Sequence, residues 1–163
     1  GGGFNVDIFS FLFGSILAVT DEETLISAIL SVTVISIIIK HYREILSVTF
    51  DEDLAKTSGI NTDLINNVLA IMTSVTVVLT MKLVGVMLTS ALIILPAMTA
   101  FQNAKSFKSA MIHSVLIALF AVNTGIVLSF MIDLPTGAVI VLINISLFCL
   151  SLFIKRLSIK TRS

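Results

Sequence analysis

The chain has 163 residues, of which 56% are hydrophobic and 12% charged, and its mean hydropathy is +1.10. Soluble domains carry about 25% charged residues, so this composition favours a protein embedded in a membrane. The formal net charge is zero, which removes any electrostatic case for binding nucleic acid.

The first apolar segment of the chain is too short to be a span. Residues 9–19 read FSFLFGSILAV, and a segment of this length cannot cross ~30 Å of hydrocarbon. We therefore predict a short outer re-entrant or interfacial segment within residues 1–20. Asp21, Glu22 and Glu23 follow it. Acids in a first helical turn interact favourably with the helix dipole, so they predict the start of the next helix.

Five longer apolar stretches predict an all-α fold, a polytopic transmembrane helical bundle that occupies residues 21–157. They run over Leu25–Ile39, Leu64–Met81, Val84–Phe101, Ala110–Ile132 and Thr136–Ile154. Residues 158–163 are predicted to be a cytoplasmic tail. The connection at 82–85 has one charge and one glycine, which suits either a loop or a broken helix.

The basic residues predict the orientation of these spans. If the 40–63 loop is cytoplasmic, every Lys and Arg except Lys82 lies on the cytoplasmic side. This bias is the positive-inside pattern. We therefore predict a multi-pass protein of the inner (plasma) membrane with a cytoplasmic C-terminus.

The third span contains a proline, Pro96, within VGVMLTSALIILPAMTA (84–100). Proline removes a backbone donor and clashes with the preceding turn, and lipid offers no replacement partner for the freed carbonyls. We expect Ser or Thr hydroxyls, neighbouring helices or water to bond those carbonyls, and Thr89, Ser90 and Thr99 are close candidates. The pattern indicates a helix buried in the bundle and kinked toward the 102–108 loop. A kink that serves packing alone is the alternative.

The same stretch, 84–100, resembles the signature of one family, the permease subunit of zinc/manganese-type metal ABC importers. Three more stretches fit in the same order: FLFGSILAVTDEETL (11–25), FDEDLAKTSGI (50–60) and DLPTGAVIVL (133–142). They resemble the family's outer segment, first inner loop and last outer turn. The match covers most of residues 9–157 and extends, more distantly, to siderophore and cobalamin permeases.

The resemblance implies part of an ABC-importer transmembrane domain over 1–163, which moves a divalent metal ion (zinc, manganese or iron) by alternating access. It implies four partners: an ATP-binding subunit, an extracytoplasmic metal-binding protein, a second permease copy and the lipid bilayer. The metal is cargo, and no permanently bound cofactor is expected. No catalytic triad pattern or phosphate-binding loop is present, so we predict a transport subunit rather than an enzyme.

Two other functions remain open. The family's N-terminal spans, with their Gly-Asp…His motif, have no counterpart in this sequence. A truncated, non-transporting membrane scaffold or remnant is therefore the first alternative. A carrier driven by an ion gradient should have paired ionisable residues within its spans, and these are scarce here.

Two inner loops are candidate docking sites for the ATPase. In residues 50–60, Asp51 and Glu52 precede Ala55, and Gly59 can stop a short helix; an ordinary capped loop helix is the alternative. The resemblance implies a coupling helix at 102–110, which we prefer as the primary docking site. Its candidate residues are Gln102, Asn103, Ala104, Lys105, Ser106, Phe107 and Lys108. Phe107 is a plausible anchor, although the two lysines could instead meet lipid phosphates.

The candidate residues for the translocation path or gate are Pro96, Ser90, Asn144, Asp133 and Thr136. Asp133 offers the hard oxygen ligand that suits a divalent cation, or it only fixes the turn. Asn144 lines the path, or it bonds one helix to another. Thr136 can cap the last helix. His41 and His113 lack a partner at metal-ligand spacing and are predicted to pack at the interface.

Overall fold

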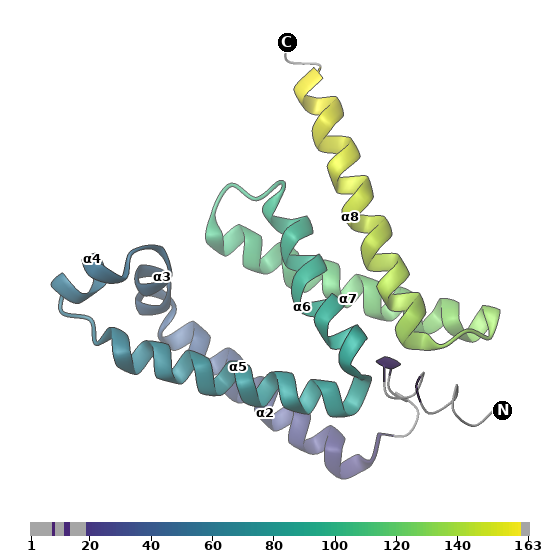
Figure 1. The fold of residues 1–163 in the computed structure, drawn as a ribbon, viewed down its shortest axis with the longest axis horizontal. Coiled ribbons are helices and arrows are strands. Elements are labelled where there is room, and N and C mark those ends of the chain that lie inside the picture. The colour runs from purple at the N-terminus through teal and green to yellow at the C-terminus, as the bar shows by residue number, and fades with distance from the viewer. Residues whose placement is uncertain (1–7, 9–11, 14–18, 161–163) are drawn as a thin grey trace. The chain divides into compact units, whose positions relative to one another are not determined.

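The structure of the chain is a computed structural model that describes residues 8, 12–13 and 19–160. The elements within these residues are helices, which confirms the all-α prediction. They are α2 (Asp21–Lys40), α3 (Tyr42–Phe50), α4 (Glu52–Thr57), α5 (Thr62–Val84), α6 (Val86–Phe101), α7 (Phe107–Ile132) and α8 (Thr136–Lys160). The chain divides into two units, which are described separately here (Figure 1).

Four of the described helices are long and apolar enough to cross a membrane: α2, α5, α7 and the Thr136–Arg156 part of α8. Their apolar side chains are exposed, as at Ile39 (72%) and Phe130 (91%). A surface this apolar requires lipid or another protein to cover it. The fold is therefore that of a multi-pass membrane protein. The remaining predicted span, α6, has 16 residues and a length of ~24 Å.

A single glycine separates α5 from α6. Gly85 is buried and has a φ of 86°, a left-handed conformation that other residues adopt only with strain. Its amide donates to the Met81 carbonyl at 3.0 Å, and its own carbonyl accepts the Thr89 amide at 3.1 Å. The 82–85 connection is thus a broken helix, one of the two forms that the sequence allowed.

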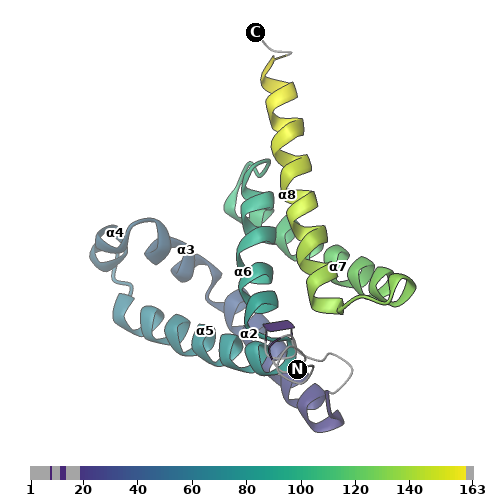
Figure 2. The ribbon, with the colours of Figure 1, turned by 45° about the vertical axis from the view of Figure 1, so that its right-hand side comes forward.

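The first unit holds residues 81–160 and the described residues near the N-terminus. Its helices α6, α7 and α8 all contact one another, as both views of the ribbon indicate (Figure 1 and Figure 2). The closest approach involves Gly125 of α7, where an added Cβ would lie 2.4 Å from Ile140 Cγ1 of α8. Most of the predicted outer segment lies outside the described residues. Phe13 is described, and its carbonyl oxygen would lie 2.8 Å from a Cβ added at Gly137.

The second unit holds residues 18–80. The helix α2 starts with a capping box, in which the Thr20 hydroxyl accepts the Glu23 amide and the Glu23 carboxylate accepts the Thr20 amide. This arrangement satisfies two amides that the helix leaves free, and it confirms the predicted start. The core of the unit is small and lies where α3, α4 and α5 meet, around Val48, Ala55 and Ile65.

Candidate functional site

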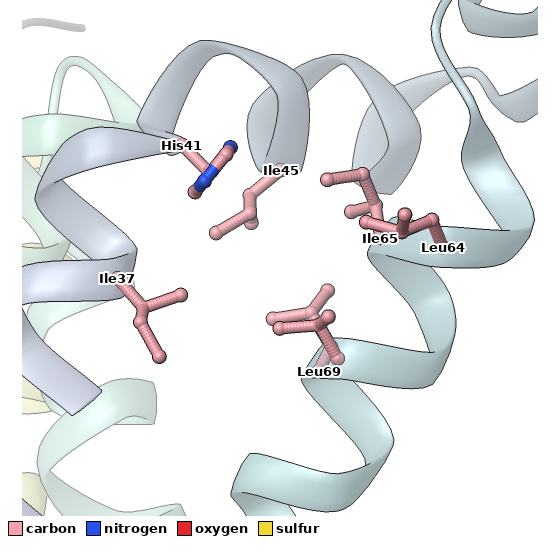
Figure 3. A pocket seen from close by; sticks show the side chains of 7 residues that line it. Ile37, His41, Ile45, Leu64, Ile65 and Leu69 are labelled. Atoms are coloured by element: carbon pink, nitrogen blue, oxygen red, sulfur yellow. The ribbon is translucent and has the colours of Figure 1, made fainter. Parts of the chain in front are cut away.

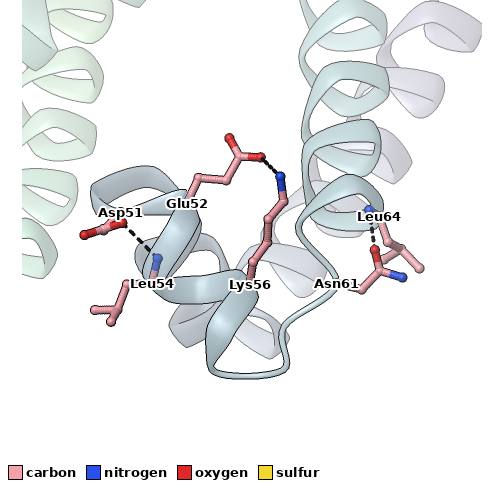
Figure 4. Close-up of polar contacts among 6 residues, drawn as sticks. All are labelled: Asp51, Glu52, Leu54, Lys56, Asn61 and Leu64. Atoms are coloured by element: carbon pink, nitrogen blue, oxygen red, sulfur yellow. Dashed lines mark hydrogen bonds and ion pairs between the residues drawn. The ribbon is translucent and has the colours of Figure 1, made fainter.

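The segment 50–60 forms a short helix, α4, that is capped at both ends, as the sequence predicted. Asp51 is the N-cap, and its Oδ1 accepts the Leu54 amide at 2.9 Å (Figure 4). At the other end Gly59 has a φ of 84°. Its amide donates to the Lys56 carbonyl, and the Ile60 amide donates to the Ala55 carbonyl, both at 3.1 Å. These are the two bonds of a Schellman motif.

Apolar contacts fix α4 on the core of the second unit. Ala55 is 2% exposed, and Ile60 packs against the same cluster. An apolar contact of the residue that follows the capping glycine, here Ile60, accompanies many Schellman motifs. The opposite face is polar: Glu52 Oε1 and Lys56 Nζ form an ion pair at 3.1 Å (Figure 4). The hydrogen bond that the Lys56 ammonium donates to the Glu52 carboxylate raises the pKa of Lys56 above its ordinary value. Lys56 therefore keeps its positive charge at neutral pH.

Two large apolar side chains next to α4 are exposed, although they lie outside the candidate spans. Phe50 ends α3 and is 72% exposed, while Leu54 of α4 is 64% exposed. Asp51, Glu52 and Asp53 lie between these two residues in the sequence and are also exposed. An apolar pair with an acidic border is typical of a protein-binding surface. We call this surface, residues 50–54, the α4 surface.

The prediction of a separate short helix at 102–110 is wrong. Residues 102–106 form an irregular connection, and 107–110 are the first turn of α7. Ser106 decides where α7 begins, because its Oγ accepts the Ser109 amide at 3.2 Å and caps the helix. Lys105 and Lys108 are exposed, and Phe107 is half-buried. The segment is therefore a loop followed by the capped first turn of α7. The short separate helix on this chain is α4, in the 50–60 segment.

The 102–106 loop is joined to α8 by a hydrogen bond. Asn103 Nδ2 donates to Ser151 Oγ at 3.1 Å, which places the loop and the C-terminal half of α8 at the same end of their unit. The neighbouring Gln102 has a buried Oε1 with no hydrogen-bond partner, and Ala104 is half-buried. The sequence did not predict a role for Ser151, because no sequence pattern relates Asn103 to a residue 48 positions away.

The hydroxyls near Pro96 do not bond the carbonyls that the proline frees, which corrects the prediction. Thr89 donates to the Gly85 carbonyl and Thr99 to the Leu95 carbonyl, each at 2.7 Å, while Ser90 donates to the Val86 carbonyl at 2.9 Å. Each hydroxyl has one proton, which is thereby used. Pro96 is buried and α6 remains helical to Phe101. One face of α6 packs on α7 and α8, as predicted, while another face, with Ile93 and Ile94, is exposed.

The structure does not place all the candidate pathway residues in the same kind of environment. Asn144 is 1% exposed. Its Nδ2 donates to the Ile140 carbonyl of its own helix at 3.0 Å, and its Oδ1 has no hydrogen-bond partner among the described residues. Pro96 is likewise buried, whereas Ser90 is exposed on another face of α6. Asn144 makes no described bond to a second helix, so the helix-bonding alternative lacks support.

Asp133 and Thr136 form the turn between α7 and α8. Asp133 is exposed, and its backbone has the left-handed helical conformation (φ 53°). It is the C-cap of α7, and its amide donates to the Ser129 carbonyl. Aspartate tolerates this conformation better than most residues. Thr136 is the first residue of α8, and its hydroxyl bonds Ser129 Oγ at 2.8 Å. Instead of capping α8, as predicted, the Thr136 side chain therefore forms a hydrogen bond that joins α8 to α7.

No group of three His, Cys, Asp or Glu side chains comes together within the described part of the chain. Among the described residues, Asp133 therefore stands as a single carboxylate. His41, which was predicted to lack a partner at this spacing, does have one three residues on. Its Nδ1 lies 2.7 Å from Glu44 Oε2. His113 Nδ1 lies 2.7 Å from the Ser109 carbonyl oxygen, so both histidines have local structural contacts.

Taken together, the spans and the connecting segments define a multi-pass helical membrane protein. The ABC 3 transport family matches residues 2–155, and the chain belongs to that family. Among solved structures, PsaBC from Streptococcus pneumoniae in complex with Fab has the same fold. Its TM-score is 0.87 at 30% identity, over 99% of this chain and 59% of that chain.

Curated relatives carry names that refer to metal uptake. The chain is 32% identical over 148 residues to the high-affinity zinc uptake system membrane protein ZnuB of Haemophilus influenzae. It is also 32% identical over 150 residues to the manganese import system permease protein ScaB of Streptococcus pneumoniae. These matches cover 91% and 92% of this chain but 57% and 54% of the relatives. The chain therefore spans about half the length of these relatives.

Proposed function

We propose that the chain is part of the membrane-spanning subunit of an ATP-driven importer of a divalent metal ion: zinc, manganese or iron. The observation that carries this proposal is the family match over residues 2–155, and the metals named for the relatives support it. ATP is hydrolysed by a separate subunit, and an extracytoplasmic protein delivers the metal. Two permease copies form the path in the inner membrane, and it opens alternately to either side.

The ATPase docks on the cytoplasmic side against the α4 surface and the 102–110 segment. The support for the α4 surface is its construction. Both ends of α4 are capped within the chain, and the surface exposes Phe50, at the end of α3, and Leu54 of α4. Apolar side chains that fill a partner's pocket supply most of the energy of an interface. The basic segment 105–108 adds a second, polar contact.

The path runs along the exposed face of α6 that carries Ser90 rather than through the interior of the three-helix unit. A hydrated ion needs polar groups that it can reach, and Pro96 and Asn144 are buried. Asp133 lies at the outer mouth as a single oxygen donor. Movement of the docked 102–106 loop passes directly to α6, because the loop begins at the end of that helix.

The proposal is tested by growth of a bacterial strain that lacks its own zinc and manganese importers. The chain is expressed with the N-terminal half of a family member and with a matching ATPase. We expect growth on limiting metal, and Leu54→Glu should abolish it, while Thr57→Gln, at an exposed position of the same helix outside the α4 surface, should not. Membrane-inserted protein that restores no growth would contradict the proposal and favour the non-transporting scaffold.

A further inference from the structure

The second unit contains a pocket of about 190 Å³ between α2, α3 and α5, separate from the α4 surface (Figure 3). Ile65 at its base is 4% exposed, while Leu64 at its edge is 52% exposed, so the pocket opens to the surroundings. Six of the side chains that line it are aliphatic, and one is an imidazole. They are Ile37, His41, Ile45, Leu64, Ile65, Val68 and Leu69.

The lining selects an apolar occupant. Apolar cavities of roughly 150 Å³ stay free of water and take apolar guests. The imidazole of His41 is the one polar group in the lining, and its Nδ1 is already bonded to Glu44 at 2.7 Å. The side chains of Ile37, Ile45 and Leu69 point into the same space (Figure 3). A hydrocarbon chain fits these surroundings better than water or a polar ligand.

The position of the pocket identifies the source of that chain. It lies where α2 ends, at Lys40, and where α5 begins, at Thr62. Both helices are long enough to cross the membrane, so their ends mark the boundary between hydrocarbon and water. Phospholipid acyl chains meet their phosphates at this depth. A lipid can therefore reach the pocket from the bilayer that surrounds the protein.

Two cations flank the histidine of the pocket. Lys40 is the last residue of α2, Arg43 lies in the first turn of α3, and both are exposed. Neither forms an ion pair with another described residue. Long basic side chains extend toward lipid phosphates at a membrane surface. We propose that this pocket binds one acyl chain of an anionic phospholipid, with its phosphate held by Lys40 and Arg43.

The sequence supplies a probe for this site. Tyr42 is the single tyrosine of the chain, tryptophan is absent, and Tyr42 lies between His41 and Arg43. Its fluorescence in lipid vesicles therefore reports on this region alone. The probes are phosphatidylglycerol and phosphatidylcholine with brominated acyl chains, each present as a minor component. We expect brominated phosphatidylglycerol to quench Tyr42 more strongly than brominated phosphatidylcholine at equal mole fraction.

Two sets of variants separate the pocket from ordinary lipid contact. Val68→Phe fills the pocket and should lower quenching by phosphatidylglycerol, whereas Val78→Phe, on the exposed side of α5, should not. Lys40→Gln with Arg43→Gln changes two exposed residues and leaves the core intact. Because a cation near anionic lipid changes affinity about fivefold, this pair should lower the preference for phosphatidylglycerol at least about tenfold.

Three results would overturn the proposal. The first is equal quenching by the two lipids, and the second is equal behaviour of the Val68 and Val78 variants. The third is a shift from dimer to monomer on Val68→Phe with no change in quenching, which would assign the pocket to a second copy of the chain. Helix content measured for each variant by circular dichroism checks that it is folded. Metal transport does not enter this test, so its outcome is independent of the proposed function.

Discussion

Asn144 is a buried polar residue whose amide oxygen has no donor. Leaving such a group unsatisfied costs about 1–3 kcal/mol, and the described bonds of Asn144 remain within α8. The described hydrogen bonds of Asn144 therefore do not join α8 to α6 or α7.

Replacing Asn144 by leucine should leave the free energy of unfolding unchanged or raise it by about 1 kcal/mol. Unfolding in mixed detergent, followed by circular dichroism, measures the change. Asn123→Leu is the matched control, because Asn123 also bonds a carbonyl one turn back but is exposed. A loss of stability confined to the Asn144 variant would restore the helix-bonding role.

Gly125 permits the close approach of α7 and α8. An added Cβ would lie 2.4 Å from Ile140 Cγ1 and 3.1 Å from the Ile140 backbone Cα. The Ile140 side chain can rotate away from the added Cβ, but the Ile140 backbone cannot. Gly125→Ala should therefore lower the free energy of unfolding by about 1–3 kcal/mol, measured in the same assay.

Ile140→Ala provides the test of this mechanism. In a double-mutant cycle, the cost of Gly125→Ala should shrink when the Ile140 side chain is shortened. Additive costs for the two substitutions would show that the contact is not the cause.

At the scale of elements, the long helices could be predicted because hydrocarbon imposes a minimum apolar length. The predicted stretch Leu64–Met81, for example, became α5 at Thr62–Val84. Its earlier start has a local cause, since Asn61 Oδ1 accepts the Leu64 amide at 3.1 Å. Within the candidate docking sites, 50–60 was predictable because its caps are local in sequence, with Asp51 and Gly59 at its ends.

The 102–110 segment could not be predicted in the same way. Its conformation depends on the Ser106 cap and on a bond from Asn103 to Ser151. A pair separated by 48 residues leaves no periodic pattern in the sequence. Likewise, the bond between Thr136 and Ser129 depends on how α7 and α8 meet, and a cap was the simpler expectation from the residue alone.

The Asp51 cap should determine the stability of α4. Removing an N-cap carboxylate costs about 1 kcal/mol, so Asp51→Ala should accelerate hydrogen exchange at the Leu54 amide about fivefold, measured by mass spectrometry. Asp53→Ala removes an equal charge from the first turn without removing the bond, and it should change exchange less. Equal acceleration in the two variants would mean that charge rather than the cap supports the helix.

At the scale of the whole molecule, the distribution of basic residues predicts which ends of the helices face the cytoplasm. The match to the PsaBC fold supports the helical arrangement, and the orientation follows from the positive-inside pattern. In a Cys149→Ser background, a cysteine at Lys155 should react with a membrane-impermeant thiol reagent only after cells are opened. A cysteine at Lys82 should react in intact cells. The reverse pattern would invert the predicted topology and place the α4 surface outside.

The central claim is that this chain, completed by an N-terminal half and an ATPase, imports a divalent metal. ATP-driven accumulation of radioactive zinc or manganese in proteoliposomes tests it most directly. We predict uptake that requires ATP and is lost in the Leu54→Glu variant, because the ATPase then no longer couples to the permease. Uptake absent under every condition, despite a correctly inserted complex that hydrolyses ATP, would contradict the account.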